Sequence, residues 1–315
     1  TFVGLYGSAT TYNRRAMKTT SMIALLLGLA VVSVLVVWQG LETVAALLAN
    51  AGWPLLLVCL FAPLDQFASS QAWRVLFPAA GRPRTFETLA ASWMGSAVNN
   101  LLPVASIGGE LAKARVITFR SYPAVDALST VVVDKTAQAI TVLLWALVGI
   151  AMLAGASADA GLVTGTLTGA GLLAIGIGGF IAVQLLGGFS AAARPTAKIL
   201  PGNRIPDLVA GADALDDAIR EIYHRIGAVA ASCAWRLAGR VMLVPEIPLA
   251  AYLMGHPIGM AEAVLISGLI VGLRGVAFAV PVALGVQEGG YIAIGALVGI
   301  PVDLMLAVSL ATRIR

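Results

Sequence analysis

Charged residues are scarce in this sequence. Lys, Arg, Asp and Glu make up 11% of its 315 residues, whereas an ordinary soluble domain carries about 25%. Hydrophobic residues make up 59% of the chain, and no soluble core could bury that much apolar surface. The composition therefore excludes an ordinary soluble protein and predicts an integral membrane protein whose partners are membrane lipids.

Cysteine and histidine are also rare, with two residues of each. Cys59 and Cys233 lie in apolar runs, so we interpret them as small buried side chains rather than as a disulfide or metal site. The histidines show no metal-ligand spacing, and the sequence contains no GxSxG, HExxH or P-loop motif. We therefore expect no catalytic residue, no metal and no cofactor, and we do not expect an enzyme.

The basic residues lie scattered in loops rather than in one patch, so the net charge of +4 indicates topology and not nucleic-acid binding. Following the positive-inside rule, we place the N-terminal Arg14, Arg15 and Lys18 in the cytoplasm. The loops that then fall inside carry Lys or Arg: 78–84, 120–123 and 187–206. The loops that fall outside lack both: 39–52, 155–161, 255–259 and the one near residue 300.

Proline and glycine interrupt the apolar pattern twice, over residues 99–110 and 281–290, and each interruption contains one carboxylate, Glu110 or Glu288. The segment 110–119 covers only about half of the ~30 Å hydrocarbon core at about 1.5 Å per residue. We therefore predict that each interruption forms a hairpin that enters and leaves the membrane on one side. The residues expected to unwind or break the helices are Pro103, Gly108, Gly109, Pro281, Gly285 and Gly289.

One offset of 178 residues relates the unusual positions in the two halves: Pro103 and Pro281, Glu110 and Glu288, Pro123 and Pro301, Lys135 and Arg313. The topology opens the first hairpin to the cytoplasm and the second to the exterior. We therefore predict an all-α fold, a polytopic membrane helical bundle with two re-entrant hairpins in inverted repeats, which is typical of transporters. The single transmembrane domain, 1–315, would comprise a tail (1–20), a first repeat (85–153), a cytoplasmic amphipathic helix (207–225) and a second, inverted repeat (260–315).

Two further segments are informative. Residues 207–225 place apolar side chains three and four positions apart and carry more acidic than basic residues. A helix that binds anionic lipid would be basic, so we expect this one to pack on the bundle. Residues 302–315 are too short to cross the membrane, so either they are buried in protein or the native chain continues.

Ionisable residues inside apolar segments are costly to keep. The functional interpretation is a polar chamber that binds a lipid headgroup while the lipid tails stay in the bilayer. The alternative is a set of internal ion pairs that holds the broken helices together. We favour the functional interpretation for Glu110, Glu288, Lys135 and Arg313. The full set of candidates is Glu110, Glu288, Lys135, Arg274, Arg313, Asp134, Asp65, Arg240 and Gln287.

Three further ionisable residues in apolar segments, Asp65, Arg236 and Asp134, have separate interpretations. Asp65 either pairs with Arg74 or joins the chamber, and the sequence leaves both open. Arg236 is expected to extend its side chain to the cytoplasmic surface. Asp134 and Lys135 are adjacent in the sequence but point about 100° apart on a helix, so we do not expect them to be partners.

Three motifs, VNNLLPVASIGGE at 98–110, VVVDK at 131–135 and LGVQEGG at 284–290, resemble a known family. They are similar to lysylphosphatidylglycerol synthase transmembrane (flippase-like) proteins and, within that family, to hopanoid-biosynthesis-associated membrane proteins. The resemblance implies a helical bundle with re-entrant hairpins that moves a polar lipid between leaflets, while the synthase activity belongs to a separate soluble domain. Family members often have Arg where this chain has Lys135, and Lys keeps the charge but loses the bidentate geometry.

We therefore expect a lipid transporter or flippase of a bacterial inner (cytoplasmic) membrane, acting on a polar or charged lipid of the hopanoid pathway or of phospholipid type. Two alternatives stay open. The first is a non-transporting scaffold that presents lipids to hopanoid or lipid A biosynthetic enzymes, which would then be its partners. The second is a membrane-embedded enzyme that modifies lipids.

Overall fold

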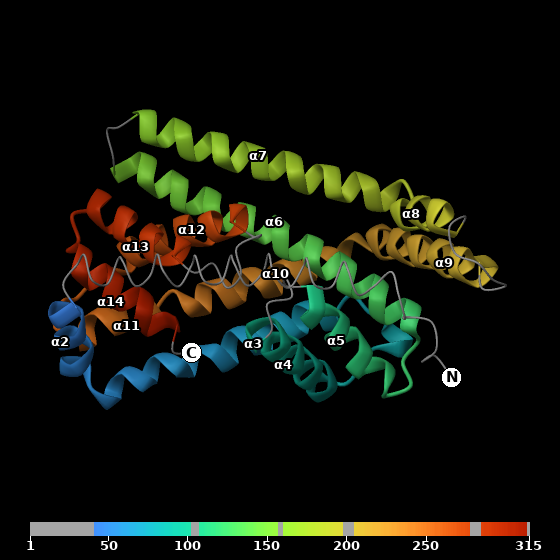
Figure 1. Cartoon of the computed structure of the whole chain (residues 1–315), viewed down its shortest axis with the longest axis horizontal. Helices are drawn as coiled ribbons and strands as arrows, with labels where there is room; N and C mark the ends of the chain where they lie inside the picture. Colours follow the sequence, from blue (N-terminus) through green and yellow to red (C-terminus); the bar gives the residue numbers. More distant parts are fainter. Residues whose placement is uncertain (1–40, 102–106, 157–159, 198–204, 278–284, 314–315) are drawn as a thin grey trace.

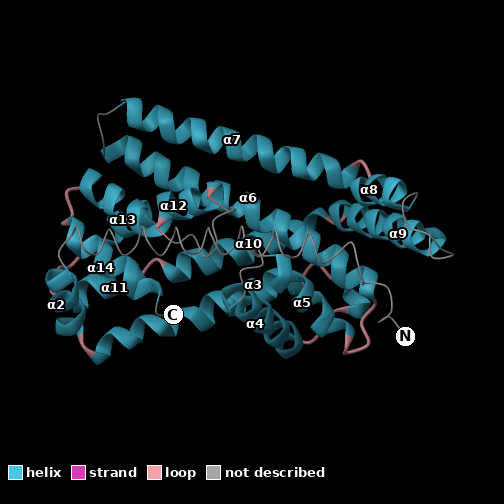
Figure 2. Ribbon diagram, viewed as in Figure 1, coloured by secondary structure: helices cyan, strands magenta, loops and turns pink. Residues whose placement is uncertain are grey.

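The computed structural model describes residues 41–101, 107–156, 160–197, 205–277 and 285–313. These residues form helices joined by short turns, and no strand occurs among them (Figure 2). The all-α prediction is therefore confirmed. The predicted N-terminal tail (1–20) and its basic cluster lie outside the described residues, and so do Pro103 and Pro281.

The helices follow one another with few residues between them, which suits a chain built from apolar helical runs. In chain order they are α2 (Leu41–Ala51), η1 (Trp53–Leu60), α3 (Phe61–Arg74), η2 (Ala79–Gly81), α4 (Thr85–Leu101), α5 (Ile107–Thr118), α6 (Ala124–Ala156), α7 (Ala160–Leu185), α8 (Gly188–Ala197), α9 (Ile205–His224), α10 (Ile226–Leu243), α11 (Glu246–Leu253), α12 (Met260–Val276), α13 (Val286–Leu297) and α14 (Val302–Arg313).

Four helical segments among the described residues are long and apolar enough to cross a bilayer: Trp53–Arg74, Ala124–Gly155, Ala160–Leu185 and Ile226–Leu253. The shortest has 22 residues, which at about 1.5 Å per residue matches the ~30 Å hydrocarbon core. The last combines α10 and α11 across the turn at Val244 and Pro245. These lengths and the apolar surfaces confirm the prediction of a polytopic membrane bundle.

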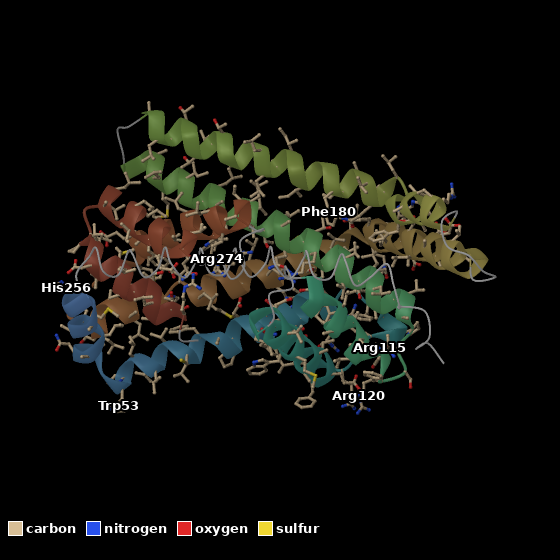
Figure 3. The ribbon with its side chains drawn as sticks, in the orientation of Figure 1. Trp53, Arg115, Arg120, Phe180, His256 and Arg274 are labelled. Carbon is tan, nitrogen blue, oxygen red and sulfur yellow. The ribbon has the colours of Figure 1, made fainter. Side chains whose placement is uncertain are left out.

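The long helices lie roughly side by side along the long axis of the molecule (Figure 1). The end of α6 and the start of α7 lie at the same end of the molecule as α2, whereas α8 and α9 lie at the opposite end. Figure 3 shows His256, in a predicted external turn, at one end of the molecule and Arg120, in a predicted cytoplasmic turn, toward the other end. These two turns therefore lie toward opposite ends of the molecule.

Glycine allows two pairs of helices to approach each other closely. A Cβ on Gly95 of α4 would lie 2.7 Å from the carbonyl oxygen of Gly109 on α5, and the backbone N–H of Gly109 donates to Oδ1 of Asn99 at 2.8 Å. A Cβ on Gly268 of α12 would lie 2.7 Å from Cα of Gly149 on α6. The first contact closes the α4–α5 hairpin, and the second joins the two predicted repeats.

Three glycine assignments were wrong. Helix α5 begins at Ile107, so Gly108 and Gly109 lie inside a helix and do not keep the backbone unwound. Gly289 likewise lies inside α13, after its first turn. At Gly109 the glycine permits close packing rather than unwinding. Gly285, by contrast, precedes α13 with φ 78, a left-handed conformation that glycine adopts without strain.

The two short hairpins keep the predicted pairing of helices. Helix α5 has 12 residues and packs against α4, and α13, also with 12 residues, packs against α12 and α14. A 12-residue helix is about 18 Å long, too short to cross the hydrocarbon core. The pairs are consistent with re-entrant hairpins, and their depth in a bilayer stays a prediction.

Helices α8 and α14 test two predictions about single segments. Residues 188–197 form α8, so the predicted loop over 187–206 was wrong in this part. Helix α14 is buried inside the bundle, with Met305, Leu306 and Ala307 at 0% exposure. The alternative that the last segment is buried in protein is therefore confirmed.

Candidate functional site

The strongest candidate site is a cluster of charged side chains on α5, α6 and α10. On α5, Glu110 and Lys113 are one turn apart, and Nζ of Lys113 lies 3.1 Å from Oε2 of Glu110. The same Nζ lies 2.7 Å from Oδ2 of Asp134 on α6. On the next residue of α6, Nζ of Lys135 lies 2.7 Å from Oε1 of Glu110. Glu110 and Lys113 of α5 thus bond to different residues of α6, Lys135 and Asp134 respectively.

Arg236 completes this cluster from α10. Its Nη2 and Nε donate to Oδ1 of Asp134 at 2.6 and 3.1 Å. The side chain of Asp134 is completely buried, so both of its oxygens need cationic or hydrogen-bonding partners. Lys113 and Arg236 supply them, and three helices are thereby tied together.

A second buried pair lies on α13 and α14. Glu288 is completely buried, and Arg313 contacts both of its oxygens, from Nε to Oε1 and from Nη2 to Oε2, the latter at 3.1 Å. The backbone N–H of Gly285 also donates to Oε2 of Glu288, at 2.8 Å. The carboxylate therefore both caps the N-terminus of α13 and joins α13 to α14.

The two centres repeat one arrangement. Glu110 and Lys135 lie on successive helices, α5 and α6, and Glu288 and Arg313 lie on successive helices, α13 and α14. Both pairs join a Glu at the start of a short helix to a cation on the next helix. The offset that the sequence showed between positions thus extends to the contacts that those positions make.

A third group surrounds Arg240 on α10. The charges that act on its guanidinium group are those of Asp65, Arg236 and Arg274. Asp65, on α3, lies beside Gly239, where a Cβ would be 3.0 Å from Oδ1. Figure 3 shows Arg274 about halfway along the molecule, away from both ends.

Asp65 forms no ion pair with Arg74 in the described parts of the chain. Nε of Arg74 donates instead to the carbonyl oxygen of Pro83 at 2.7 Å. Gln287 is also buried, and its Nε2 lies 3.4 Å from Oγ1 of Thr312. It therefore adds a polar link between α13 and α14.

Sequence reasoning made one error here and missed one residue. Arg236 does not extend to the surface, because its side chain is held by the buried Asp134. Lys113 was not among the candidates, although its spacing of three residues from Glu110 on one helix could have indicated it. The expectation that Asp134 and Lys135 have different partners agrees with the contacts, since the former bonds to Lys113 and Arg236 and the latter to Glu110.

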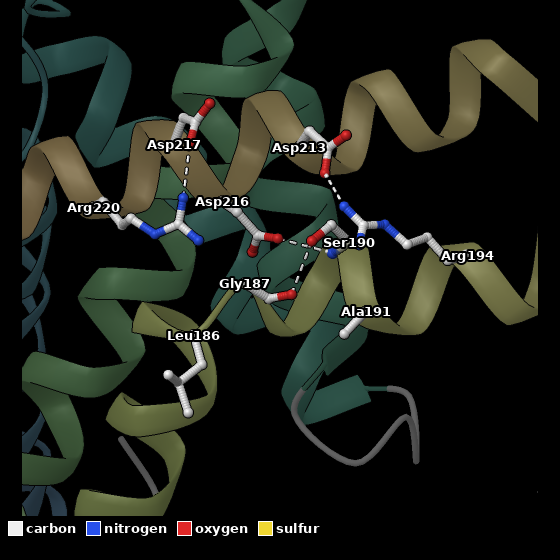
Figure 4. Close-up of a pocket in the computed structure, with 9 residues that line it drawn as sticks. All are labelled: Leu186, Gly187, Ser190, Ala191, Arg194, Asp213, Asp216, Asp217 and Arg220. Carbon is white, nitrogen blue, oxygen red and sulfur yellow. Dashed lines mark hydrogen bonds and ion pairs between the residues drawn. The ribbon is translucent and has the colours of Figure 1, made fainter.

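A second polar region lies on the surface, in a pocket formed by the end of α7, α8 and α9 (Figure 4). Its charged groups bond to one another: Arg220 Nη1 to Asp217 at 2.7 Å and the Ser190 N–H to Asp216 at 2.8 Å. No group of three potential ligands that could hold a metal ion occurs in the part of the chain that the structure describes. Asp216 thereby joins α9 to α8, whereas Asp217 and Arg220 pair within α9.

Comparison with known proteins gives one match. The family model described as "Lysylphosphatidylglycerol synthase TM region" matches residues 25–315. No curated protein and no solved structure matches the chain. Both charged centres lie within the matched region.

Proposed function

Because the chain belongs to the family of the lysylphosphatidylglycerol synthase TM region, a family of lipid-related membrane proteins, we propose that it moves a polar or charged lipid between the two leaflets of a bacterial inner membrane. The lipid is of phospholipid type or comes from the hopanoid pathway. The lipid tails stay in the bilayer, and the headgroup passes the charged centres inside the bundle. The protein acts as a transporter and not as an enzyme.

The single observation that supports this proposal is the repetition of one acid–base pair at two short helices. Glu110 bonds to Lys135 as Glu288 bonds to Arg313. Buried ion pairs are costly, and well-packed apolar side chains of similar volume often stabilise a protein as well or better. Two such pairs at equivalent places are therefore better explained by a headgroup that exchanges with them than by stability alone.

The contacts suggest how a headgroup would pass. A zwitterionic or charged headgroup can replace one member of an ion pair while the other stays neutralised, which lowers the cost of carrying charge through an apolar region. The first pair would open to the cytoplasm and the second to the exterior. Opening the two hairpins in turn would give alternating access, while the Gly149–Gly268 contact keeps α6 and α12 together.

The orientation of the chain is part of the proposal. The turn that contains His256 lies at one end of the molecule, and the turn that contains Arg120 lies toward the other end (Figure 3). By the positive-inside rule, the end with Arg120 faces the cytoplasm, and so does the N-terminus.

A lipid-flipping assay tests the function. Purified protein is reconstituted into liposomes that contain fluorescent phosphatidylglycerol, phosphatidylethanolamine or a labelled hopanoid, and dithionite bleaches the outer leaflet. Wild type should expose inner-leaflet lipid to bleaching. The double variant Glu110→Gln/Glu288→Gln should slow this about tenfold or more, because each charge-assisted hydrogen bond contributes about 1.5–3 kcal/mol.

The matched control is Glu221→Gln, which makes the same change at an exposed position of α9. It should flip lipid as wild type does. If wild type bleaches no faster than empty liposomes for all three lipid classes, the transport proposal is wrong. Stable co-purification with a lipid-biosynthetic enzyme would then favour the scaffold, and formation of a modified lipid by the purified protein would favour an enzyme.

A further inference from the structure

Lys113 is the cation that two carboxylates share in the charged cluster on α5, α6 and α10. Its Nζ lies 3.1 Å from Oε2 of Glu110, one turn away on α5, and 2.7 Å from Oδ2 of Asp134 on α6. A Lys ammonium group is a compact charge on a flexible stem, so its own geometry does not fix where it points. Its place between two carboxylates therefore depends on what else contacts the ammonium group.

An aromatic ring makes such a contact. Nζ of Lys113 lies 4.5 Å from the centroid of the ring of Trp73, on α3, and a cation within about 6 Å is attracted to the negative face of an indole. Trp73 is completely buried, so solvent does not screen this attraction. The contact adds α3 to a cluster whose ion pairs join α5, α6 and α10.

Two neighbours fix the orientation of the Trp73 ring. Its Nε1 donates to Oγ1 of Thr130 at 3.1 Å, and Thr130 lies one turn before Asp134 on α6. The ring of Phe77 packs against that of Trp73, with centroids 5.4 Å apart and an interplanar angle of 65°. Helix α6 therefore orients both the ring and one of the carboxylates that contact the ammonium group of Lys113.

From these contacts we propose that Trp73 is a positioning residue of the charged cluster. The face of its ring holds the ammonium group of Lys113 between Glu110 and Asp134, so that one cation neutralises both carboxylates and α5 stays docked on α6. Without the ring, the ammonium group can turn toward one carboxylate and leave the other with less compensation of its charge.

The second repeat places neutral residues where the first has the shared cation and its partner on α6. Counting on by the offset of 178 residues, Tyr291 stands at the position of Lys113, and Thr312 stands at that of Asp134. Positioning by Trp73 is therefore a property of the first hairpin, and it makes the placement of α5 depend on α3. Its consequence for lipid movement rests on the proposed transport.

Positioning of a cation differs from simple space-filling in what it requires of the ring. Space-filling depends on the shape of the ring, whereas attraction of a cation depends on the electron density of its face. Fluorine atoms on an indole withdraw electron density from that face and change the volume of the ring little. Replacing Trp73 by tryptophan with one, two or three ring fluorines therefore weakens the attraction in steps while the packing is kept.

The first experiment introduces these fluorinated tryptophans in place of Trp73 in the full chain, by nonsense suppression. It measures the SDS concentration at the midpoint of unfolding in mixed micelles. The midpoint should fall with each added fluorine in the wild-type background and should not depend on fluorine in Lys113→Met, which leaves no ammonium group over the ring. The Lys113→Met background should fold, because Arg236 still bonds to one carboxylate and Lys135 to the other.

The matched control is the same series at Trp145. This residue is also buried, and its Nε1 donates to a hydroxyl oxygen, Oγ of Ser267, at 3.1 Å. Fluorine also changes the strength of an indole N–H donor, so the control measures that effect alone. No cation lies over the Trp145 ring among the described residues. Its fluorination should therefore shift the midpoint equally in the wild-type and Lys113→Met backgrounds.

The second experiment measures lipid movement with the dithionite assay and fluorescent phosphatidylglycerol. The protein with three fluorines on Trp73 should flip this lipid about threefold more slowly than wild type, as expected for a weakened cation–π contact. Trp73→Phe keeps an aromatic face and should retain part of the rate. Trp73→Leu has no such face and should lose more of it, about tenfold.

Equal midpoints across the fluorine series at Trp73 would overturn the proposal, and so would the same slope in Lys113→Met or at Trp145. If the fluorinated proteins do not fold, Trp73→Phe should lower the midpoint less in Lys113→Met than in the wild-type background, and equal losses would overturn the proposal. A midpoint that falls with fluorination while the flipping rate stays constant would mean that the contact serves stability alone, and the positioning role would be wrong.

The two experiments together separate this inference from the proposed function. If wild type flips no lipid but the midpoint depends on ring fluorination through Lys113, the positioning of Lys113 stands and transport is wrong. If wild type flips lipid and fluorination of Trp73 changes neither the midpoint nor the rate, transport stands and the role of Trp73 is wrong.

Discussion

Replacing Arg236 by Gln tests the bonding of the buried cluster directly. Arg236 donates two hydrogen bonds to Oδ1 of Asp134, at 2.6 and 3.1 Å, and the acceptor is completely buried. Hydrogen bonds to charged groups contribute about 1.5–3 kcal/mol each, and removing one partner of a buried ion pair costs about 3–5 kcal/mol. Because Lys113 still donates to Oδ2, we expect the free energy of unfolding to fall by about 3 kcal/mol, the lower end of that range.

The assay is equilibrium unfolding of purified protein in mixed micelles by SDS. The double variant Asp134→Asn/Arg236→Gln removes both charges, so it should be more stable than Arg236→Gln alone, and the difference gives the coupling energy. Neutral hydrogen bonds between membrane helices average about 0.6 kcal/mol. A loss below about 1 kcal/mol in Arg236→Gln would mean that this side chain reaches the surface, and the cluster described above would be refuted.

Two further predictions concern packing and pH. Gly268→Ala should lower the free energy of unfolding by about 1–3 kcal/mol, because the new Cβ meets the backbone of α6. The control is Gly169→Ala, where no atom lies within 4 Å of the added Cβ; it should raise the free energy of unfolding by about 0.5–1 kcal/mol in the same assay. Equal effects of the two substitutions would contradict the close contact. The backbone N–H of Arg84, 2.9 Å away, is the main cause that lowers the pKa of Glu87 from its ordinary value of 4.5. A lowered carboxyl pKa stabilises the folded state above pH 4.5, and this stabilisation disappears as the pH falls through the lowered pKa. Glu87→Gln should therefore lower the free energy of unfolding more at about pH 7 than at about pH 3. A loss of stability that does not depend on pH would contradict this cause.

The sequence was sufficient for the class of fold because apolar run length and charge scarcity have direct physical consequences in a bilayer. A 26-residue apolar run such as Ala160–Leu185 can hardly be anything but a spanning helix. The same reasoning predicted that 302–315 could not cross, and burial of α14 follows from its apolar composition. The offset of 178 residues was also predicted from the sequence, because Glu110 and Glu288 are carboxylates in two similar interruptions of the apolar pattern.

The predictions that were wrong concern residues whose contacts depend on which face of a helix they occupy. Arg236 could reach the surface or a buried carboxylate from the same sequence position, and the choice depends on where α6 places Asp134. Gly109 could unwind a helix or permit close packing, and only the neighbouring backbone of Gly95 decides between the two uses. Such choices require three-dimensional packing, so local sequence signals cannot make them.

The two charged centres contain equivalent Glu residues but differ in the balance of positive and negative charge. The centre on α5, α6 and α10 joins three cations to two carboxylates, in the order Lys135, Glu110, Lys113, Asp134 and Arg236. The centre on α13 and α14 joins one cation to one carboxylate. In the transport that we propose, an anionic headgroup would be attracted to the first centre and would meet a neutral pair at the second. Since α5 contributes both Glu110 and Lys113, a shift of this one helix would break its bonds to both adjacent residues of α6 together. In the transport that we propose, the first hairpin is where binding of an anion and movement of a helix would be coupled most directly.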